Sequence, residues 1–487
     1  MAQVILVYPF TGLDLKDFSV WLPLAVLNVA STLVKDYDVA VVDQRLDKEW
    51  AKTLSQHLND DTLCVGISSM TGTQIKQGLQ VAAKVRQLAP QLPIVWGGNH
   101  PTLVVEQTAA HPLVDIVVQG EGEFTFRQLV DCFAQDRNWK ETPNIAYKQD
   151  GKVVVQGKGR DFFDPAGMPE LPYHLVDVSK YVYGRMSFGK PLRSLPFITS
   201  SGCPYACTFC CQPVLSNRRW RKMKPEVAVE RVFKLVEKYN LEAIEFHDEE
   251  FFVDRKRGMA IADLIGGKFQ WYAQTRMDDL LALDLNRLEK NGLKMVQPGL
   301  ETGSPRILEM IKKEETIEQY KKANLALAAT GIEATYNFMM GFPTETHEDL
   351  LSTVDLALEL LKSNPKAHVS GFYVYVPYPG AELFHLALQE GFQYPSSLEE
   401  WGKFNRQHLN SPWVEEKLAV FKNLLFTSKL IDGERLIRTF ENRPLIKKGL
   451  QSLSKRYRKF WEEHRFDLTW DVRLLAFAAK HYFAWKR

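Results

Sequence analysis

The hydrophobic residues of this chain fall into short runs that alternate with amphipathic segments. Five apolar runs in the first 140 residues have the length of buried strands, at 4–10, 38–43, 62–69, 93–98 and 115–120. Between them, apolar residues recur every three or four positions, which predicts helices at 21–35, 48–58, 73–88 and 123–134. Strands that alternate with helices in this way are typical of a doubly wound parallel sheet, so we expect an α/β fold for residues 1–140.

The same alternation returns after residue 195, now six times. Strands are predicted at 196–200, 242–247, 269–275, 294–300, 333–340 and 368–376. Helices are predicted at 225–239, 255–265, 283–291, 304–312, 316–330, 346–362 and 381–390. Six strand–helix units are too few for an eight-stranded barrel, so residues 196–390 predict a partial (β/α)6 barrel with an open side.

Two segments lack this alternation. Residues 141–195 hold four prolines, several aromatic residues and one hairpin signal at Asp150-Gly151, and we expect a linker there. Residues 391–487 have helical patterns dense in aromatic side chains, with the basic run 455–459 just before Phe460 and Trp461. This tail predicts a helical domain, either a simple packed cap or a surface helix that meets an anionic membrane or substrate.

Length and composition bound the class of protein. The 487 residues are too many for one hydrophobic core, and contents of 45% hydrophobic and 25% charged residues are ordinary for a globular protein. A formal net charge of +2 gives no reason to expect a nucleic-acid partner. Neither a signal peptide nor a run of about 18 apolar residues occurs, so we expect a cytoplasmic protein. The six cysteines include a crowded four, which is no disulfide framework and suits a reducing compartment.

The strongest chemical signal is the stretch 201–211, SGCPYACTFCC, directly after the first predicted barrel strand. Cys203, Cys207 and Cys210 stand at CxxxCxxC spacing. Three thiolates on one tight loop suit a [4Fe-4S] cluster whose fourth iron stays open to a ligand. A zinc knot is the alternative, but zinc sites usually need a second CxxC or a histidine pair, which this chain does not offer. Cys211 lies outside the motif, and we expect it to be a small buried apolar residue.

This spacing, with Phe209 just before the last cysteine, resembles the signature of the radical S-adenosylmethionine (SAM) superfamily. In that superfamily SAM chelates the open iron, and the reduced cluster cleaves SAM to methionine and a 5′-deoxyadenosyl radical. The resemblance implies an electron donor of the flavodoxin or ferredoxin type. It also implies contacts to SAM by Phe209, by Asp248 or Glu249 (ammonium), Arg276 (the SAM carboxylate, or else a phosphate), Glu301 (ribose), Gly341 and the backbone around Val374 and Tyr375 (adenine).

Small or turn-forming residues follow the strands of the first domain, and ligands of parallel sheets bind at that edge. A flavodoxin-like domain ahead of a radical SAM motif resembles the cobalamin-binding domain of class B radical SAM enzymes. The resemblance implies cobalamin contacts at Thr11, Gly12, Ser68, Ser69, Met70, Gly97, Gly98, His100, Gly120, Glu121, Gly122 and Glu123.

The cobalt ligand is where this chain departs from a related pattern. Methionine-synthase-type domains carry DxHxxG after the second strand, and their histidine binds cobalt. Here residues 43–47 are DQRLD, with neither the histidine nor the glycine. We therefore expect cobalamin without a protein histidine on cobalt. His100 is the nearest candidate by sequence, and its alternative is a plain turn residue.

The resemblance implies an enzyme whose leading hypothesis is methyl transfer to an unactivated carbon of a small-molecule or lipid-like substrate. One alternative is cobalamin-dependent chemistry without methylation, such as oxidative cyclisation, ring contraction or C–C bond formation. A methylthiotransferase would carry three cysteines in its first domain, whereas this one has only Cys64 and Cys132. A non-catalytic sensor of cobalamin or of the cluster is a further alternative. The sequence singles out no catalytic side chain and no particular substrate.

Overall fold

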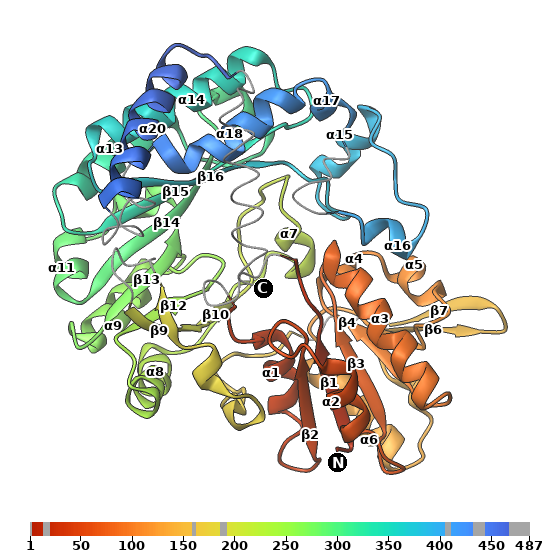
Figure 1. Cartoon of the computed structure of the whole chain (residues 1–487). Coiled ribbons are helices and arrows are strands. Elements are labelled where there is room, and N and C mark those ends of the chain that lie inside the picture. The colour runs from red at the N-terminus through yellow and green to blue at the C-terminus, as the bar shows by residue number, and fades with distance from the viewer. Residues whose placement is uncertain are drawn as a thin grey trace. The chain divides into compact units, whose positions relative to one another are not determined.

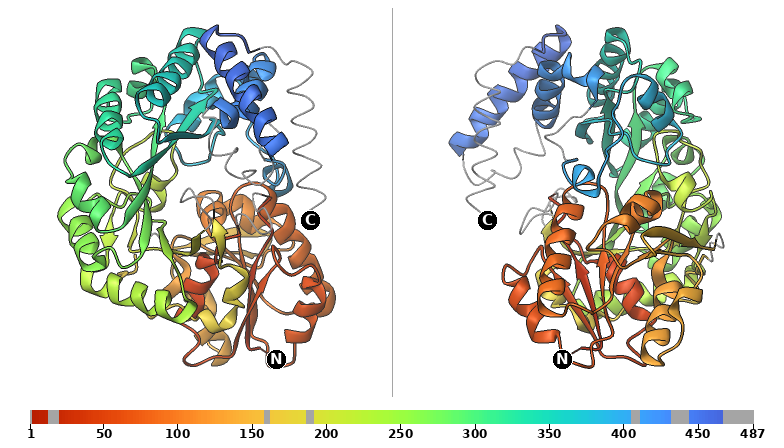
Figure 2. Two further views of the ribbon diagram at one scale, coloured as in Figure 1. Left: turned by 60° about the vertical axis from the view of Figure 1, so that its left-hand side comes forward. Right: turned by 90° about the vertical axis from the view of Figure 1, so that its right-hand side faces the viewer.

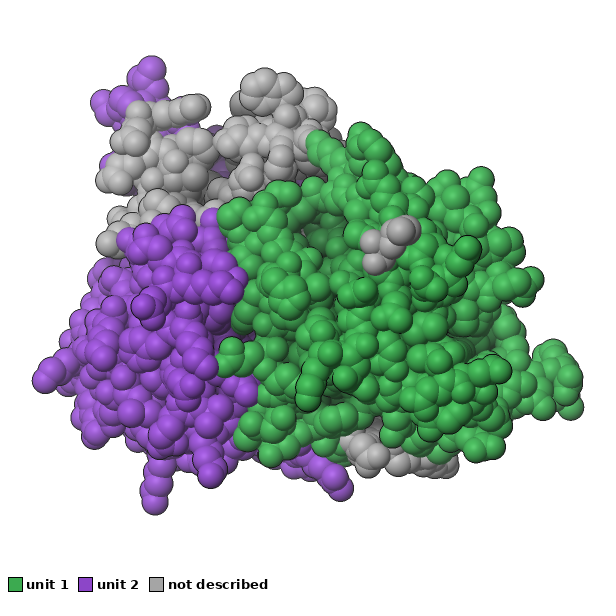
Figure 3. Space-filling model, turned by 90° about the horizontal axis from the view of Figure 1, so that it is seen from below, with its two compact units in different colours: residues 1–181, 214–217, 394–408 green, residues 182–213, 218–393, 409–487 purple. Residues whose placement is uncertain are grey.

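The structure, a computed structural model, describes residues 2–12, 20–157, 162–185, 192–404, 411–431 and 444–466. The chain forms two compact units, each with more than one segment of the sequence (Figure 3). The first unit holds residues 1–181, 214–217 and 394–408, and the second holds residues 182–213, 218–393 and 409–487. The predicted domain boundaries at 140, 195 and 390 stay predictions.

The first unit is built on a seven-stranded sheet with the order β2-β1-β3-β4-β5-β6-β7 (Figure 1). Its strands are β1 (Val4–Tyr8), β2 (Val39–Asp43), β3 (Cys64–Ser68), β4 (Ile94–Gly97), β5 (Ile116–Val118), β6 (Ile145–Gln149) and β7 (Lys152–Gln156). β1 to β5 pair in parallel, whereas β6 and β7 are antiparallel. The predicted hairpin at Asp150-Gly151 is confirmed, and it extends this sheet.

The helices of the first unit are α1 (Leu24–Ser31), α2 (Trp50–His57), α3 (Thr73–Leu88), α4 (Asn99–Leu103), α5 (Val105–Ala110) and α6 (Gly122–Ala134). The core between α1, α6 and the sheet includes Leu6, Cys64, Val95 and Phe126, all buried. A sheet covered on both faces explains why its strands are nearly continuous apolar runs. The short helices α4 and α5 were not predicted, since neither is long enough to show a helical period.

The second unit has a seven-stranded sheet with the order β16-β15-β14-β13-β12-β9-β8. Its strands are β8 (Tyr183–Arg185), β9 (Leu192–Phe197), β12 (Ala243–Phe246), β13 (Gln270–Thr275), β14 (Leu293–Glu301), β15 (Glu333–Met340) and β16 (Ala367–Val374). Only β8 is antiparallel to its neighbour, so six parallel strands form the predicted partial barrel. The first barrel strand begins earlier than predicted, at Leu192. Ser200 and Ser201 instead form β10 (Ser200–Ser201), which pairs with β11 (Arg221–Lys222).

Helices cover the outer face of this sheet (Figures 1 and 2). They are α8 (Pro225–Tyr239), α9 (Arg255–Ile265), α10 (Met277–Leu280), α11 (Leu285–Lys290), α12 (Pro305–Met310), α13 (Ile317–Ala328), α14 (His347–Ser363) and α15 (Leu383–Gln389). The predicted bounds of α8 and α9 are confirmed. Terminal signals explain this precision, because Asp254 caps α9, whereas α8 begins at Pro225 and ends before Asn240 in the left-handed conformation.

The tail contributes to both units. In the first unit, α16 (Leu398–Trp401) belongs to the segment 394–404. In the second, α17 (Pro412–Glu415), α18 (Leu418–Ile431) and α20 (Pro444–Glu462) continue the layer of helices past β16. The indole of Trp461 donates to the Thr427 hydroxyl at 2.9 Å, and its ring lies 5.0 Å from Phe372. Among the described helices, none has both the length and the apolar character to span a membrane.

Candidate active site

The three motif cysteines lie on the loop between β10 and α7 (Gln212–Leu215). No disulfide involves them, and all three are partly buried. Burial is the main cause that raises the pKa of Cys203 to about 11 and that of Cys210 to about 12, and nearby Cys207 contributes to both values. A metal that binds them must displace their protons.

The donor set fits an iron–sulfur cluster better than zinc. A zinc ion would need four ligands within about 2.3 Å of one point. Within the described ranges, no group of three or more His, Cys, Asp or Glu side chains is close enough to hold a single ion. A cubane cluster is larger than one ion, so its thiolates stand farther apart. Three thiols on one loop therefore match a cluster that leaves one iron open.

Asp248 supports the start of this loop. Its fully buried carboxylate accepts hydrogen bonds from the Thr199 amide (3.1 Å), the Thr199 hydroxyl (2.7 Å) and the Ser200 hydroxyl. Glu249 is exposed, and it accepts from the Gln212 side-chain amide at 2.7 Å. Two residues were predicted to bind the SAM ammonium. The carboxylate of Asp248 is buried and hydrogen-bonded to Thr199 and Ser200, whereas Glu249 is exposed to solvent.

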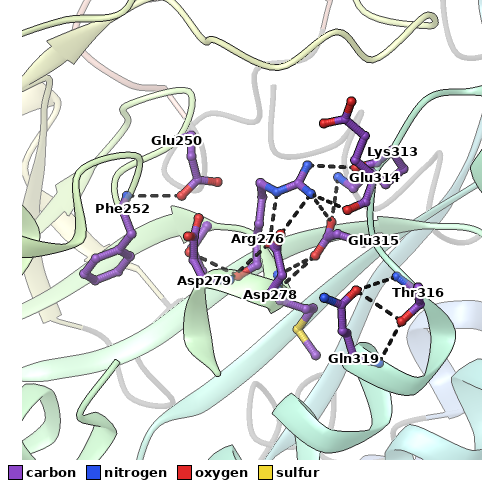
Figure 4. A network of polar contacts seen from close by, with 12 residues as sticks. Glu250, Phe252, Arg276, Asp278, Asp279, Lys313, Glu314, Glu315, Thr316 and Gln319 are labelled. Carbon is purple, nitrogen blue, oxygen red and sulfur yellow. Dashed lines mark hydrogen bonds and ion pairs between the residues drawn. The ribbon is translucent and has the colours of Figure 1, made fainter. Parts of the chain in front are cut away.

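Arg276 is held within a buried charge network (Figure 4). Its guanidinium donates to Asp278 (3.0 Å) and to the carbonyls of Lys313 (2.9 Å) and Glu314 (3.3 Å). The same group stacks over the ring of Tyr205, 4.0 Å from its centroid. The predicted contact to a SAM carboxylate stays a prediction, but here Arg276 joins the cysteine loop to the loop after α12.

The network contains two charged residues that were not predicted from the sequence, Lys313 and Glu315. The Lys313 ammonium lies 3.4 Å from Glu301 Oε1 and 3.6 Å from Glu315 Oε2. Burial on its own would lower the pKa of Lys313, but the two carboxylates and Cys207 raise it above its ordinary value. In the sequence KKEE both residues look like part of a solvated helix surface, which is why the pattern did not reveal them.

Glu301 ends β14 in a strained conformation. Its φ is 65°, in the left-handed region that residues other than glycine seldom adopt. A side chain at Gly299 would collide with the Glu301 carboxylate, so this glycine makes room for it. Strained backbone of this kind is often found at ligand sites, in agreement with the predicted ribose contact.

The predicted adenine contacts lie together at the ends of β15 and β16. Gly341 has φ 73°, and its amide donates to Glu345 Oε2 at 2.6 Å. The ring of Phe342 stacks on Tyr375 (centroids 5.6 Å apart), and Phe209 of the cysteine loop meets Phe342 edge-on at 6.3 Å. The Tyr375 amide donates to the Met340 carbonyl at 2.8 Å, just after Val374 ends β16.

A row of polar side chains crosses the face of the sheet opposite the helices. The Tyr272 hydroxyl donates to Gln297 Oε1 (2.6 Å), and Gln297 Nε2 donates to Asn337 Oδ1 (3.1 Å). On β12, Glu245 lies 3.3 Å from the His247 ring nitrogen. Gln297, Asn337 and His247 are partly exposed, so this face can offer hydrogen bonds to a bound molecule.

In the first unit, the predicted cobalamin residues lie at the carboxyl edge of the parallel sheet. They follow β1 (Thr11, Gly12), β3 (Ser69, Met70), β4 (Gly98, His100) and β5 (Gly120 to Glu123), and Ser68 and Gly97 end their strands. Gly98 has φ 100°, and a Cβ atom there would lie 2.7 Å from the Ser69 carbonyl oxygen. The edge is therefore lined by close-packed backbone, as ligand sites of parallel sheets are.

His100 is a fully buried ring of this set. Its Nδ1 lies 2.9 Å from the Thr71 hydroxyl, and its ring meets Trp401 edge-on at 5.5 Å. Burial lowers the pKa of His100 to about 3. The structure thus places His100 in the packed interior under Trp401.

Arg45 takes the place of the histidine in the DxHxxG pattern. Its guanidinium donates to both oxygens of Asp43 (2.9 and 2.7 Å) and lies 4.3 Å from the centre of the Tyr8 ring. The Tyr181 hydroxyl also donates to Asp43 Oδ2 at 2.8 Å. Arg45 is almost fully buried in these contacts, and the segment offers no imidazole.

Comparisons with known proteins agree with this arrangement. The family model of the radical SAM superfamily matches residues 197–357, and the B12 binding domain model matches residues 13–130. An uncharacterized methyltransferase of Pyrococcus horikoshii, PH0819, is 30% identical over 371 residues, which are 75% of this chain and 78% of that protein. The chain belongs to the cobalamin-binding radical SAM enzymes.

Two further relatives of this cobalamin-binding radical SAM enzyme are informative. The anaerobic magnesium-protoporphyrin IX monomethyl ester cyclase of Rubrivivax gelatinosus is 30% identical over 66% of this chain and 57% of the cyclase. The solved structure of OxsB, with aqua-cobalamin and SAM bound, has the same fold. It has a TM-score of 0.71 at 17% identity and covers 99% of this chain and 75% of OxsB. The predicted fold, family and enzyme class are confirmed, whereas the roles of single residues stay predictions.

Proposed function

We propose that this chain is a methyltransferase that acts on an unactivated carbon of a small-molecule or lipid-like substrate. The observation that carries the proposal is the loop that presents Cys203, Cys207 and Cys210 at CxxxCxxC spacing, in a chain that also matches the B12 binding domain model. When bound, the cluster with SAM supplies a carbon-centred radical, and cobalamin supplies a methyl group. The similarity to a methyltransferase supports this reaction over the alternatives.

Each group of residues then has a defined task. Cys203, Cys207 and Cys210 hold the cluster, and Glu249 accepts hydrogen bonds from the SAM ammonium. Glu301 binds the ribose, while Gly341 with the aromatic rings of Phe342 and Tyr375 encloses the adenine. These assignments are supported by the positions of the residues at the ends of successive strands.

Cobalamin is proposed to bind at the edge formed by Thr11, Ser69, Gly98 and Gly120, without a protein histidine on cobalt. Two observations support this: Arg45 is tied to Asp43, and His100 is enclosed under Trp401. Electron paramagnetic resonance of the cob(II)alamin state tests the point. Hyperfine splitting from an imidazole nitrogen of the protein would contradict it.

The substrate is proposed to carry hydrogen-bonding groups on the side that meets the barrel strands. Gln297, Asn337 and His247 line that face with donors and acceptors. These groups are hydrogen-bonded within the protein but partly exposed, so a purely apolar substrate would remove water from them, which costs free energy. Candidates are therefore lipid-like or cyclic molecules with at least one polar edge.

The direct test uses anaerobically reconstituted protein with candidate substrates and SAM that carries a deuterated methyl group. Methyl transfer predicts a labelled product together with S-adenosylhomocysteine and 5′-deoxyadenosine. Substitution of Cys203, Cys207 or Cys210 by Ala is expected to abolish SAM cleavage, whereas Cys211→Ala retains it. Cleavage that persists in any of the first three variants would refute the ligand assignment.

A second candidate function is cobalamin-dependent chemistry without methylation, such as oxidative cyclisation. The similarity to the magnesium-protoporphyrin cyclase favours it. The two functions differ in their products, because only methyl transfer yields S-adenosylhomocysteine. If 5′-deoxyadenosine forms with substrate but no methylated product appears, the second function is the correct one.

The proposal extends to the electron donor and to the place in the cell where the enzyme works. The enzyme works in the cytoplasm with a flavodoxin- or ferredoxin-type electron donor, and α20 meets an anionic membrane surface. On this helix Leu445 and Ile446 are exposed beside basic residues such as Lys448, Lys455 and Lys459. Sedimentation with anionic vesicles, but not with neutral ones, is the expected result. Equal sedimentation with both, or with neither, would count against the membrane contact.

A further inference from the structure

A buried lysine beside the cysteine loop has no task in the function proposed above. Lys313 lies between α12 and α13, and only 8% of its side chain is exposed. Its neighbours Lys312 and Glu314 both have left-handed backbone, with φ of 50° and 57°. Lysine is rarely buried, and such backbone is uncommon outside glycine. The loop therefore accepts a conformational cost that keeps this ammonium inside the protein.

The loop that carries Lys313 is attached to the cysteine loop on both sides of Cys207. After Cys207, the Thr208 amide donates to the Ile311 carbonyl (2.9 Å), and the Thr208 hydroxyl donates to the Met310 carbonyl (3.1 Å). Before Cys207, Arg276 stacks on Tyr205 and donates to the Lys313 carbonyl (2.9 Å). These contacts fix the position of Lys313 relative to one particular cysteine.

The two cations of the network are not equivalent (Figure 4). The donors of Arg276 are engaged by Asp278 and by two backbone carbonyls. The Lys313 ammonium has carboxylates only at 3.4 and 3.6 Å, longer than the roughly 2.7–2.9 Å of a charge-assisted hydrogen bond.

We propose that Lys313 is a positioning residue that balances the negative charge at the Cys207 corner of the cluster and raises the cluster's reduction potential. This inference rests on the proposed cluster. Reduction moves one electron from an external flavodoxin- or ferredoxin-type donor, which is oxidised, to a buried group that already carries thiolate charge. A fixed ammonium in a region of low dielectric constant favours the added electron. Arg276 holds the loop that carries Lys313 through the carbonyls of Lys313 and Glu314.

The test compares the full-length protein with Lys313→Met, Lys313→Arg and the matched control Lys312→Met. Lys312 is adjacent in sequence, but it is half-exposed and pairs with Glu382 at 2.7 Å. Each protein is reconstituted anaerobically, and its cluster is titrated with reductant under electron paramagnetic resonance. At a fixed potential, Lys313→Met is expected to lower the ratio of reduced to oxidised cluster about tenfold, or about 59 mV for one electron. Lys313→Arg and Lys312→Met should stay within about twofold of the wild type.

Each other outcome overturns the inference. An unchanged potential in Lys313→Met, or an equal shift in Lys312→Met, means that the buried charge does not act on the cluster. If the metal-free Lys313→Met protein fails to fold by circular dichroism, Lys313 is structural only. A wild-type protein that assembles no iron cluster refutes the proposed function as well, whereas a normal cluster with an unchanged potential in Lys313→Met refutes only this inference.

Discussion

Single residues at the two candidate sites show which properties a local sequence motif can predict. The cysteine spacing predicted the chemistry, because it depends only on neighbours along the chain. Asp248 and Glu249 are adjacent in the same acidic run, yet one is enclosed by Thr199 and Ser200 and the other is exposed. Lys313 was missed for a similar reason. Its burial comes from Arg276, Glu301 and Glu315, and no local pattern reports such distant contacts.

Gly98 gives the first prediction. Its φ of 100° and the Ser69 carbonyl, 2.7 Å from the position of a Cβ atom, both exclude a side chain. Gly98→Ala is therefore expected to destabilise the first unit by about 1–3 kcal/mol, measured by denaturant unfolding. The control is Gly449→Ala in α20, where nothing lies within 4 Å of the added methyl group and alanine favours the helix. Equal effects of the two substitutions would show that Gly98 is not constrained.

Glu345 gives a prediction about pH. Burial raises its pKa from 4.5 to about 7, so between these values the folded protein keeps a proton that the unfolded chain releases. The free energy of unfolding is therefore highest below about pH 4.5, as far as this group is concerned. It falls by up to about 3 kcal/mol as the pH rises to about 7. In Glu345→Gln the free energy of unfolding should change less between pH 4.5 and 7, and above pH 7 this variant should be more stable than the wild type. Parallel curves for the two proteins would contradict the raised pKa.

Elements were predicted best where capping residues mark their ends. α8 and α9 have the predicted bounds, whereas β9 begins earlier than predicted, because the apolar run 195–198 hides the alternating residues before it. The segment 394–404 could not be assigned to the first unit from the sequence. Its contacts, such as that of Trp401 with Gln107, join positions almost 300 residues apart, and no hydrophobic period encodes them.

Trp401 gives a prediction at this scale. Its fully buried ring covers His100, and its indole donates to Gln107 Oε1 at 2.7 Å. Trp401→Ala is expected to cost about 3–5 kcal/mol and to loosen α4 and α5. Hydrogen exchange of the amides at 99–110 measures this loosening. Trp401→Phe keeps most of the packing but loses the hydrogen bond, so its amide protection should lie between that of the wild type and that of Trp401→Ala. Unchanged protection in Trp401→Ala would refute the covering role.

At the scale of the whole molecule, each unit has its own sheet and its own core. The family resemblance predicted this division in outline, because the two halves correspond to two ligand-binding domains. It could not predict that the first unit is assembled from three separate stretches of the chain.

The two cores lead to a thermal prediction. Heating the metal-free protein should give two calorimetric transitions, and hydroxocobalamin should raise only that of the first unit. At a concentration of about 100 times the dissociation constant, the gain is about 2.7 kcal/mol. A control without corrinoid, but with iron and sulfide, should shift the second transition instead. A single transition that moves as a whole under both treatments would contradict independent cores.

The return of residues 394–404 to the first unit has a consequence for synthesis on the ribosome. Domains ordinarily fold as they emerge, starting from the amino end, at about 5–20 residues per second. Gly72 packs directly against the Phe404 carbonyl, and Trp401 covers His100, so the first unit stays incomplete until most of the barrel has been translated. Trp401 follows Tyr181 out of the exit tunnel by an interval on the order of tens of seconds. During that interval the side of His100 that Trp401 later covers is open to solvent and to chaperones.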